Sequence, residues 1–108
     1  MRRGDLVTVA VTGDYGKPRP ALVIQSDFLP GTDSVLVCLL TTTLRAAPLY
    51  RLSLPVGEGT GLCEPSQVMV DKIMAVRRDR CGASIGRIDD AALLALGRLL
   101  AFVIGIAD

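Results

Sequence analysis

The chain has 108 residues, of which 50% are hydrophobic and 21% charged, with a net charge of +1. This length and composition are typical of a single globular domain spanning residues 1–108, and they exclude a disordered chain. The low net charge also excludes a protein that binds nucleic acid through a strong overall positive field. Any site for a polyanion must therefore be a local cluster of basic residues.

Three cysteines and the absence of histidine restrict the cellular compartment and the kinds of catalytic chemistry that we expect for this chain. The cysteines Cys38, Cys63 and Cys81 are odd in number, and no signal peptide precedes the first predicted strand, so we expect a reducing, cytoplasmic location. Without histidine a zinc site has too few ligands, and the usual general acid and base near neutral pH is missing. We therefore expect no metal site, and chemistry that uses Arg, Thr, Asp or Lys.

Short runs of alternating or continuous apolar residues predict a series of β-strands. In residues 5–11 the valines fall on one face, whereas Thr8 and Ala10 fall on the other. Turn sequences separate this run from the ones that follow. Strands this short, at this spacing, favour a small antiparallel β-barrel over a parallel α/β sheet. The further predicted strands cover residues 21–25, 34–40, 50–54, 66–70 and 72–76.

The last part of the chain predicts one helix, which begins after the good N-cap residue Asp89. Leu93, Leu96 and Leu100 recur at steps of three and four residues. The apolar residues cover nearly the whole circumference of the predicted helix. However, Arg98 interrupts them, and the apolar stretch is shorter than the ~20 residues of a membrane span. We expect no membrane association, and a helix buried by the sheet on one side and by a partner subunit on the other.

The stretch "KPRP" places Arg19 between two prolines, next to a predicted strand. Proline fixes its own φ and drives the preceding residue toward extended conformations, so the backbones of Lys17 and Arg19 are both restricted. A guanidinium offers five donors in a fixed fork that fits phosphate oxygens. The spacing leaves two interpretations of Arg19 open. It binds phosphate, or it lies in a rigid connection and pairs with a carboxylate.

Two further segments place polar side chains beside apolar strands. Threonines 41–43 end the run at 34–40, where strand-end hydroxyls lie at the rim of a sheet, although threonine is also a common strand residue. In "PSQVMVDKIMAVRRDR", Asp71 can orient a guanidinium or accept a proton; the alternative is an exposed corner between two strands. With Lys17, the candidate substrate-binding residues are Thr42, Ser66, Lys72 and Arg77.

Taken together, these segments resemble the MazF/PemK family of bacterial toxins from toxin–antitoxin systems. The similarity runs almost end to end, through "RRGDLVTV", "GKPRPALVIQSD", "VLVCLLTTT", "GLCEPSQVMVDKI" and "IGRID". It implies an SH3-like barrel with a C-terminal helix, a homodimer, and an endoribonuclease that cuts single-stranded RNA at short sequences without a metal or other cofactor. It also implies a cognate antitoxin whose disordered tail lies across the active face.

By position, the resemblance assigns the family's catalytic arginine to Arg19 and its strand-end threonine to Thr41, or to Thr42 if the strand slips by one residue. Asp71 matches a carboxylate of the PemK-like branch. That branch also has an arginine where this chain has Met69, and a histidine that this chain lacks. The match is therefore to the arginine–threonine form of the site. The proton acceptor is left open between Asp71 and water.

Two other classes of function are weighed against this one. Non-catalytic toxins that poison gyrase share the implied fold, but they contact gyrase through a tail containing tryptophan, which this chain does not have. SH3-like adaptors bind peptides in aromatic-lined grooves, whereas this chain has only two tyrosines and two phenylalanines. For an endoribonuclease, we expect the loops at 12–18 and 41–48 to set the target sequence, with Tyr15 as a candidate for stacking on a base.

Overall fold

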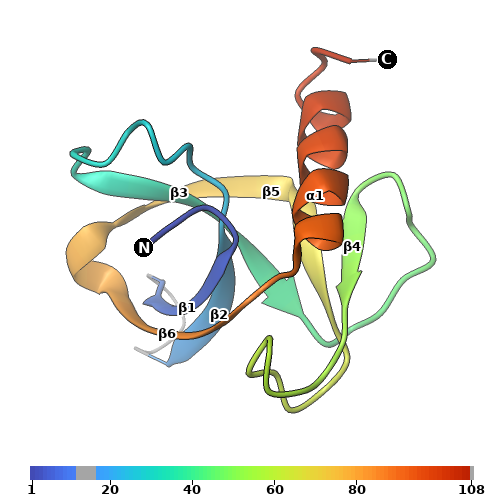
Figure 1. The fold of residues 1–108 in the computed structure, drawn as a ribbon, viewed down its shortest axis with the longest axis horizontal. Helices are drawn as coiled ribbons and strands as arrows, with labels where there is room; N and C mark the ends of the chain where they lie inside the picture. Colours follow the sequence, from blue (N-terminus) through green and yellow to red (C-terminus); the bar gives the residue numbers. More distant parts are fainter. Residues whose placement is uncertain (12–16, 108) are drawn as a thin grey trace.

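A computed structural model describes residues 1–11 and 17–107 of the chain (Figure 1). Six antiparallel strands form one sheet in the order β4-β5-β3-β2-β1-β6. A short 3-10 helix, η1 (Arg78–Arg80), links the last two strands, and helix α1 (Asp90–Val103) follows them. The strands are β1 (Asp5–Ala10), β2 (Pro18–Val23), β3 (Ser34–Thr41), β4 (Arg51–Leu54), β5 (Ser66–Arg77) and β6 (Cys81–Arg87).

The prediction of a mainly β chain with a C-terminal helix is confirmed, but two expectations about strands are wrong and one strand was not predicted. Residues 66–70 and 72–76 form one strand, because β5 continues through a bulge against β3. β2 begins at Pro18 rather than at Ala21, so both prolines lie inside a strand. β6 was not predicted, since its glycines, alanine and serine do not show the apolar alternation of a half-buried strand.

The sheet curls into an open barrel. β4 and β6 are its two edges, and no strand pairing joins them in the described ranges. The β4–β5 loop bridges the gap instead: Arg87 N donates to Gly59 O at 2.9 Å. Gly86 comes so close to the backbone of Thr60 that only a glycine fits there. The predicted antiparallel barrel is therefore completed by a contact between a loop and a strand.

Apolar side chains cover both faces of the sheet. Because alternate residues of the same strands belong to different clusters, the two clusters lie on opposite faces. The first cluster lies under α1, whose Leu96 is fully buried; burial of a leucine contributes about 1.5–3 kcal/mol. Burial, reinforced by the charge of Asp71, raises the pKa of the Cys38 thiol in this cluster to about 12. The second cluster contains Val7, Val9, Ala21, Val23, Val35, Val37, Leu39, Met69 and Val76.

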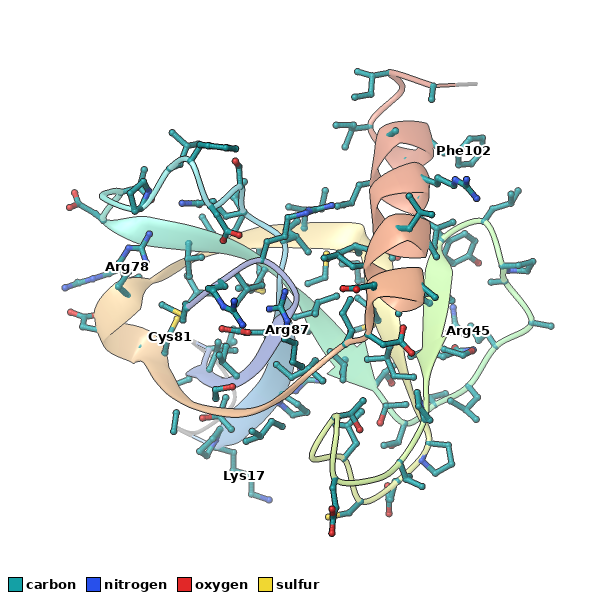
Figure 2. The ribbon with its side chains drawn as sticks, in the orientation of Figure 1. Lys17, Arg45, Arg78, Cys81, Arg87 and Phe102 are labelled. Carbon is teal, nitrogen blue, oxygen red and sulfur yellow. The ribbon has the colours of Figure 1, made fainter. Side chains whose placement is uncertain are left out.

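Helix α1 begins where the sequence predicts. The Asp89 side chain accepts a hydrogen bond from Ala92 N at 2.8 Å and caps the first turn. In the part of the chain that the structure describes, no helix is long and apolar enough to cross a membrane. One side of α1 packs on the sheet, while Leu94 and Phe102 are exposed on the other, and Figure 2 shows Phe102 extending away from the helix. Within one chain, α1 is therefore covered on one side only.

Candidate functional site

Arg19 lies in β2 at the point where this strand separates from β3. Arg19 is opposite Val9 of β1, whereas the pairing of β2 with β3 begins at Ala21. Pro18 and Pro20 fit here because proline is tolerated where a strand has a partner on one side only. The two rings hold this end of β2 extended. The backbone of the half-buried Arg19 is therefore restricted.

Arg19 and Thr41 lie on the same face and at the same end of the sheet. Ala21 is opposite Leu39 in the last pair of β2 and β3, and Arg19 and Thr41 each lie two residues beyond this pair, toward the same end of the sheet. Ala21 and Leu39 both belong to the second cluster, and side chains two residues apart share a face. The guanidinium and the hydroxyl therefore project from neighbouring strand ends at the rim of the second cluster.

Two residues of the next strands extend this arrangement. Thr41 is paired with Gln67 of β5, and Gln67 is paired with Ser53 of β4. We call this set of four residues the polar row: Arg19, Thr41, Gln67 and Ser53. Gln67 is buried, and its Nε2 contacts Ser53 Oγ at 3.3 Å. The polar row crosses β2, β3, β5 and β4 at one end of the sheet.

The hydroxyl of Thr41 already has one partner. Thr43 N donates a hydrogen bond to Thr41 Oγ1 at 3.1 Å, which uses one lone pair and leaves the hydroxyl proton for another acceptor. Thr42 lies just beyond the end of β3 and is exposed. The register therefore places Thr41, rather than Thr42, in the polar row.

A buried arginine that the sequence analysis did not single out supports the polar row. Arg51, the first residue of β4, is only 8% exposed. Its Nη1 donates to Thr43 O and to Gln67 Oε1, both at 3.1 Å, and its Nε has no hydrogen-bond partner among the residues that the structure describes. The alternation in "RLSL" groups Arg51 with Ser53, which indicates a solvent-facing side. Only its hydrogen bond to Gln67, which is distant in sequence, shows that Arg51 supports the polar row.

Ser66, a predicted substrate-binding residue, lies on the opposite face from the polar row. It is paired with Leu54 of the first cluster, and its hydroxyl donates to Glu64 O at 2.9 Å. Ser66 is also buried. The structure therefore brings Gln67, and not its neighbour Ser66, beside Thr41.

Asp71 and Lys72 lie at the bulge where β5 changes direction (Figure 1). Between the pairs Leu40–Val68 and Cys38–Ile73, β3 has one residue and β5 has four, residues 69–72. Such a bulge bends its strand and re-aims its side chains. Asp71 and Lys72 are both exposed there, as in the predicted alternative of an exposed corner.

Lys17 and Arg77 lie at different ends of the sheet. Lys17 is exposed just before β2, and Figure 2 shows it extending outward. Arg77 is paired with Ser34, the first residue of β3, whereas Thr41 is the last. At the usual rise of a strand, Arg77 and Thr41 are ~20 Å apart. Tyr15, predicted to stack on a base, lies outside the described residues.

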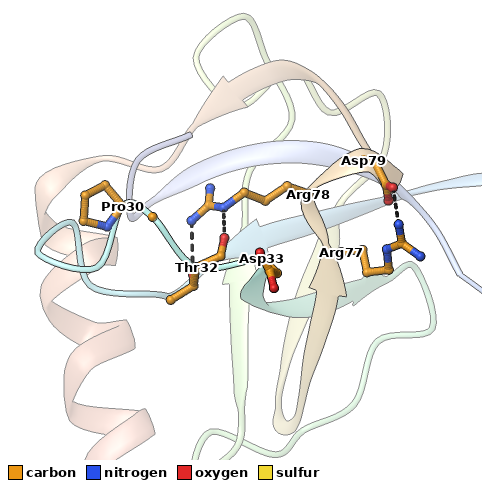
Figure 3. A pocket seen from close by; sticks show the side chains of 7 residues that line it. Pro30, Thr32, Asp33, Arg77, Arg78 and Asp79 are labelled. Atoms are coloured by element: carbon orange, nitrogen blue, oxygen red, sulfur yellow. Dashed lines mark hydrogen bonds and ion pairs between the residues drawn. The ribbon is translucent and has the colours of Figure 1, made fainter.

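Arg77 instead lines a cavity of about 660 Å³ between the β2–β3 loop and η1 (Figure 3). Arg77 forms an ion pair with Asp79, and Arg78 donates to the backbone oxygen of Thr32. These basic side chains are thus partnered within the cavity wall. The structure does not bring Arg77 together with the polar row.

Known proteins share this sequence and this fold. A family described as "PemK-like, MazF-like toxin of type II toxin-antitoxin system" matches residues 2–104. A probable endoribonuclease MazF of Mycolicibacterium smegmatis is 41% identical over 108 residues, which cover 99% of each chain. A mycobacterial endoribonuclease solved in complex with its cognate antitoxin has a TM-score of 0.82 at 23% identity, covering 100% of this chain and 98% of that one. MazF in a MazE–MazF structure from Deinococcus radiodurans has a TM-score of 0.77 at 21% identity, covering 97% and 95%.

Proposed function

We propose that this chain, which belongs to the PemK-like, MazF-like toxin family of type II toxin–antitoxin systems, is an endoribonuclease. It cuts single-stranded mRNA in the cytoplasm at a short sequence, needs no metal ion, and thereby stops growth. The observation that carries this proposal is the placement of Arg19 and Thr41 on one face at one end of the sheet. The proposal takes these two residues as the arginine–threonine site that the sequence resemblance implies.

In the proposed reaction, the ribose 2′-oxygen attacks the adjacent phosphorus. A bond forms between the 2′-oxygen and phosphorus as the bond from phosphorus to the 5′-oxygen breaks, which leaves a 2′,3′-cyclic phosphate and a 5′-hydroxyl. Negative charge grows on the two non-bridging oxygens before the bond breaks. Arg19 donates to them with its fixed fork, and Thr41 donates with its hydroxyl proton. Donors held in place beforehand stabilise such charge without reorganisation.

The 2′-hydroxyl must also lose a proton, and the leaving 5′-oxygen must gain one. Arginine is a poor base because its guanidinium stays charged throughout the working pH range. The sequence contains no histidine, and the two acceptors that we propose are the exposed carboxylate of Asp71 and water. Arg19 and Thr41 therefore act by stabilising charge, while the 2′-hydroxyl proton passes to Asp71 or water and the leaving 5′-oxygen takes a proton from water.

The proposed partner is a cognate antitoxin with an acidic, disordered segment. The backbone of Arg45 forms hydrogen bonds with the Gln67 side chain of the polar row. Arg45 therefore adds positive charge to that of Lys17 and Arg19 around this row, and Lys17 and Arg45 are exposed. A disordered acidic segment can wrap such a local basic surface and exclude RNA, with its ordering cost met on binding. The similar mycobacterial structure contains an endoribonuclease with its cognate antitoxin, which supports this pairing.

Cleavage of random-sequence, single-stranded RNA in excess chelator tests the function. We expect the purified protein to cut the RNA and to leave 5′-hydroxyl ends. Adding the antitoxin encoded beside the toxin gene should stop the reaction. A requirement for a divalent cation would contradict the mechanism. Intact RNA together with inhibited DNA supercoiling by gyrase would instead favour the non-catalytic toxin.

The exposed side of α1 forms the proposed homodimer interface. Leu94 is 60% exposed and Phe102 is 43% exposed on this side, and apolar patches of this kind mark contact surfaces. Phe102→Asp is expected to convert the dimer to a monomer in sedimentation at micromolar concentration. Phe28→Asp is the matched control, because Phe28 is 94% exposed and belongs to the β2–β3 loop rather than to α1. A wild-type protein that sediments as a monomer would contradict the proposed dimer.

A further inference from the structure

We propose that Arg51 is a positioning residue that fixes the direction of the Thr41 hydroxyl through the first residues of the β3–β4 loop. The inference deepens the proposed function, on which it rests for the role of Thr41. Arg51 lies in β4 and Thr41 at the end of β3. Neither the sequence pattern nor the family resemblance assigned a role to Arg51.

A chain of hydrogen bonds joins the two side chains. Thr43 is the link: its N–H donates to Thr41 Oγ1 at 3.1 Å, and its carbonyl accepts from Arg51 Nη1 at 3.1 Å. Arg51 thus holds the residue whose amide fills one lone pair of the Thr41 hydroxyl. With that lone pair occupied, the hydroxyl proton is directed toward another acceptor. In the proposed reaction, that acceptor is a phosphate oxygen.

Gln67 reinforces the same loop from the polar row. Its Oε1 accepts from Arg45 N at 3.0 Å and from Arg51 Nη1 at 3.1 Å. Its Nε2 donates to Arg45 O at 3.0 Å, so the backbone of Arg45 is held at both its N–H and its carbonyl. Residues 42–46 are all exposed. Hydrogen bonds from Arg51 and Gln67, rather than apolar burial, therefore hold this part of the loop.

Burying the charged side chain of Arg51 costs free energy, and packing alone would not require a charged residue at this position. Across residues 1–11 and 17–107, no carboxylate forms an ion pair with its guanidinium, and its Nε has no hydrogen-bond partner. A buried charge is unfavourable unless it is paired, and apolar residues of similar volume often replace buried ionic groups without loss of stability. The hydrogen bonds by which Arg51 orients Thr43 and Gln67 explain why a charged residue occupies this position.

A double-mutant cycle tests the coupling between Arg51 and Thr41. Arg51→Met keeps the length of the side chain but removes its donors, and cleavage is followed on an oligoribonucleotide that the wild-type protein cuts from a random pool. We expect kcat to fall about 10-fold, with a smaller change in KM, because small misplacement of a reacting group is costly. In a Thr41→Ala background, Arg51→Met should cause no further loss. Equal losses in both backgrounds would overturn the proposal.

Arg87→Met is the matched control. Arg87 is another arginine of a strand, and its Nη1 contacts Asp5 Oδ1 at 2.8 Å, away from the polar row. Any effect of Arg87→Met on kcat should be the same with and without Thr41. Arg51→Lys keeps the charge and should recover only part of the rate, because an ammonium does not reproduce the planar fork. If Arg51→Met does not fold, Arg51→Lys carries the same comparison in both backgrounds.

Amide hydrogen exchange separates this proposal from the proposed function, because it needs no RNA. The N–H groups of Thr43 and Arg45 donate to Thr41 Oγ1 and Gln67 Oε1. Their exchange should quicken in the Arg51 variants and stay unchanged in Arg87→Met. Unchanged exchange in a folded Arg51 variant would overturn the positioning role. If the wild-type protein leaves RNA intact, the proposed function fails, and the exchange rates still decide whether Arg51 holds the loop.

Discussion

Replacing Arg19 with alanine is expected to slow RNA cleavage by about 10²-fold or more, because one preorganised donor to a developing oxyanion is worth that much. RNA binding should fall less, since the donor acts most strongly in the transition state. Pro18 and Pro20 hold the backbone extended where residues 18–20 of β2 have no pairing with β3, and we propose that this preorganises the Arg19 fork for the phosphate. Single-turnover cleavage of a short RNA and growth after induction measure the effect.

Two companion variants separate charge from geometry at this position. Arg19→Lys keeps the charge but should recover little activity, because an ammonium does not form two parallel hydrogen bonds to a phosphate. Pro20→Ala should reduce activity more mildly, by loosening the backbone of Arg19 without removing its side chain. A folded Arg19→Ala protein that cleaves RNA and arrests growth like the wild type would show that the prolines serve the fold alone.

Gly86→Ala is expected to destabilise the protein by about 3 kcal/mol, at the upper end of the usual cost of overpacking. A methyl group on Gly86 would lie 2.2 Å from Thr60 O and 2.7 Å from Gly59 O. Both are backbone atoms, so no side chain can rotate away. The β4–β5 loop must therefore move and lose the hydrogen bond from Arg87 N to Gly59 O.

Urea unfolding at one fixed protein concentration measures this loss, because the stability of an associating protein depends on its concentration. Gly59→Ala is the matched control in the same loop, where an added methyl group meets no atom within 4 Å. It should leave the unfolding midpoint nearly unchanged. A Gly86→Ala protein with the wild-type midpoint would show that the loop does not need its close contact with β6.

Local sequence patterns were enough to predict the elements whose buried face is set by the spacing of apolar residues within the element itself. Alternation along residues 5–10 predicts a strand, and the capped leucine pattern after Asp89 predicts α1, because each signal is complete within one element. β6 has few large apolar side chains and forms because β1 provides its partner. The join between residues 70 and 72 depends likewise on β3, which pairs with β5 on both sides of the bulge.

The candidate site shows the same limit for single side chains. Arg19 and Thr41 were predicted as site residues from the family resemblance, because their local sequence left a purely structural alternative open for each, and the strand alternation places them on one face. Gln67 was passed over for Ser66, because the choice between them depends on how β5 pairs with β3 and β4. Arg51 was missed because its burial requires hydrogen bonds to Thr43 and Gln67.

The contact that completes the open barrel also protects the molecule against unwanted self-association. An exposed sheet edge is a template on which other chains can add strands and form aggregates. The end of β6 is occupied by the backbone of the β4–β5 loop, through Gly59 and Thr60. The other edge, β4, is only four residues long. Main-chain strand addition therefore finds a four-residue edge at β4 and a β6 edge that is covered at its end, and the proposed pairing of two copies uses the side chains of α1 instead.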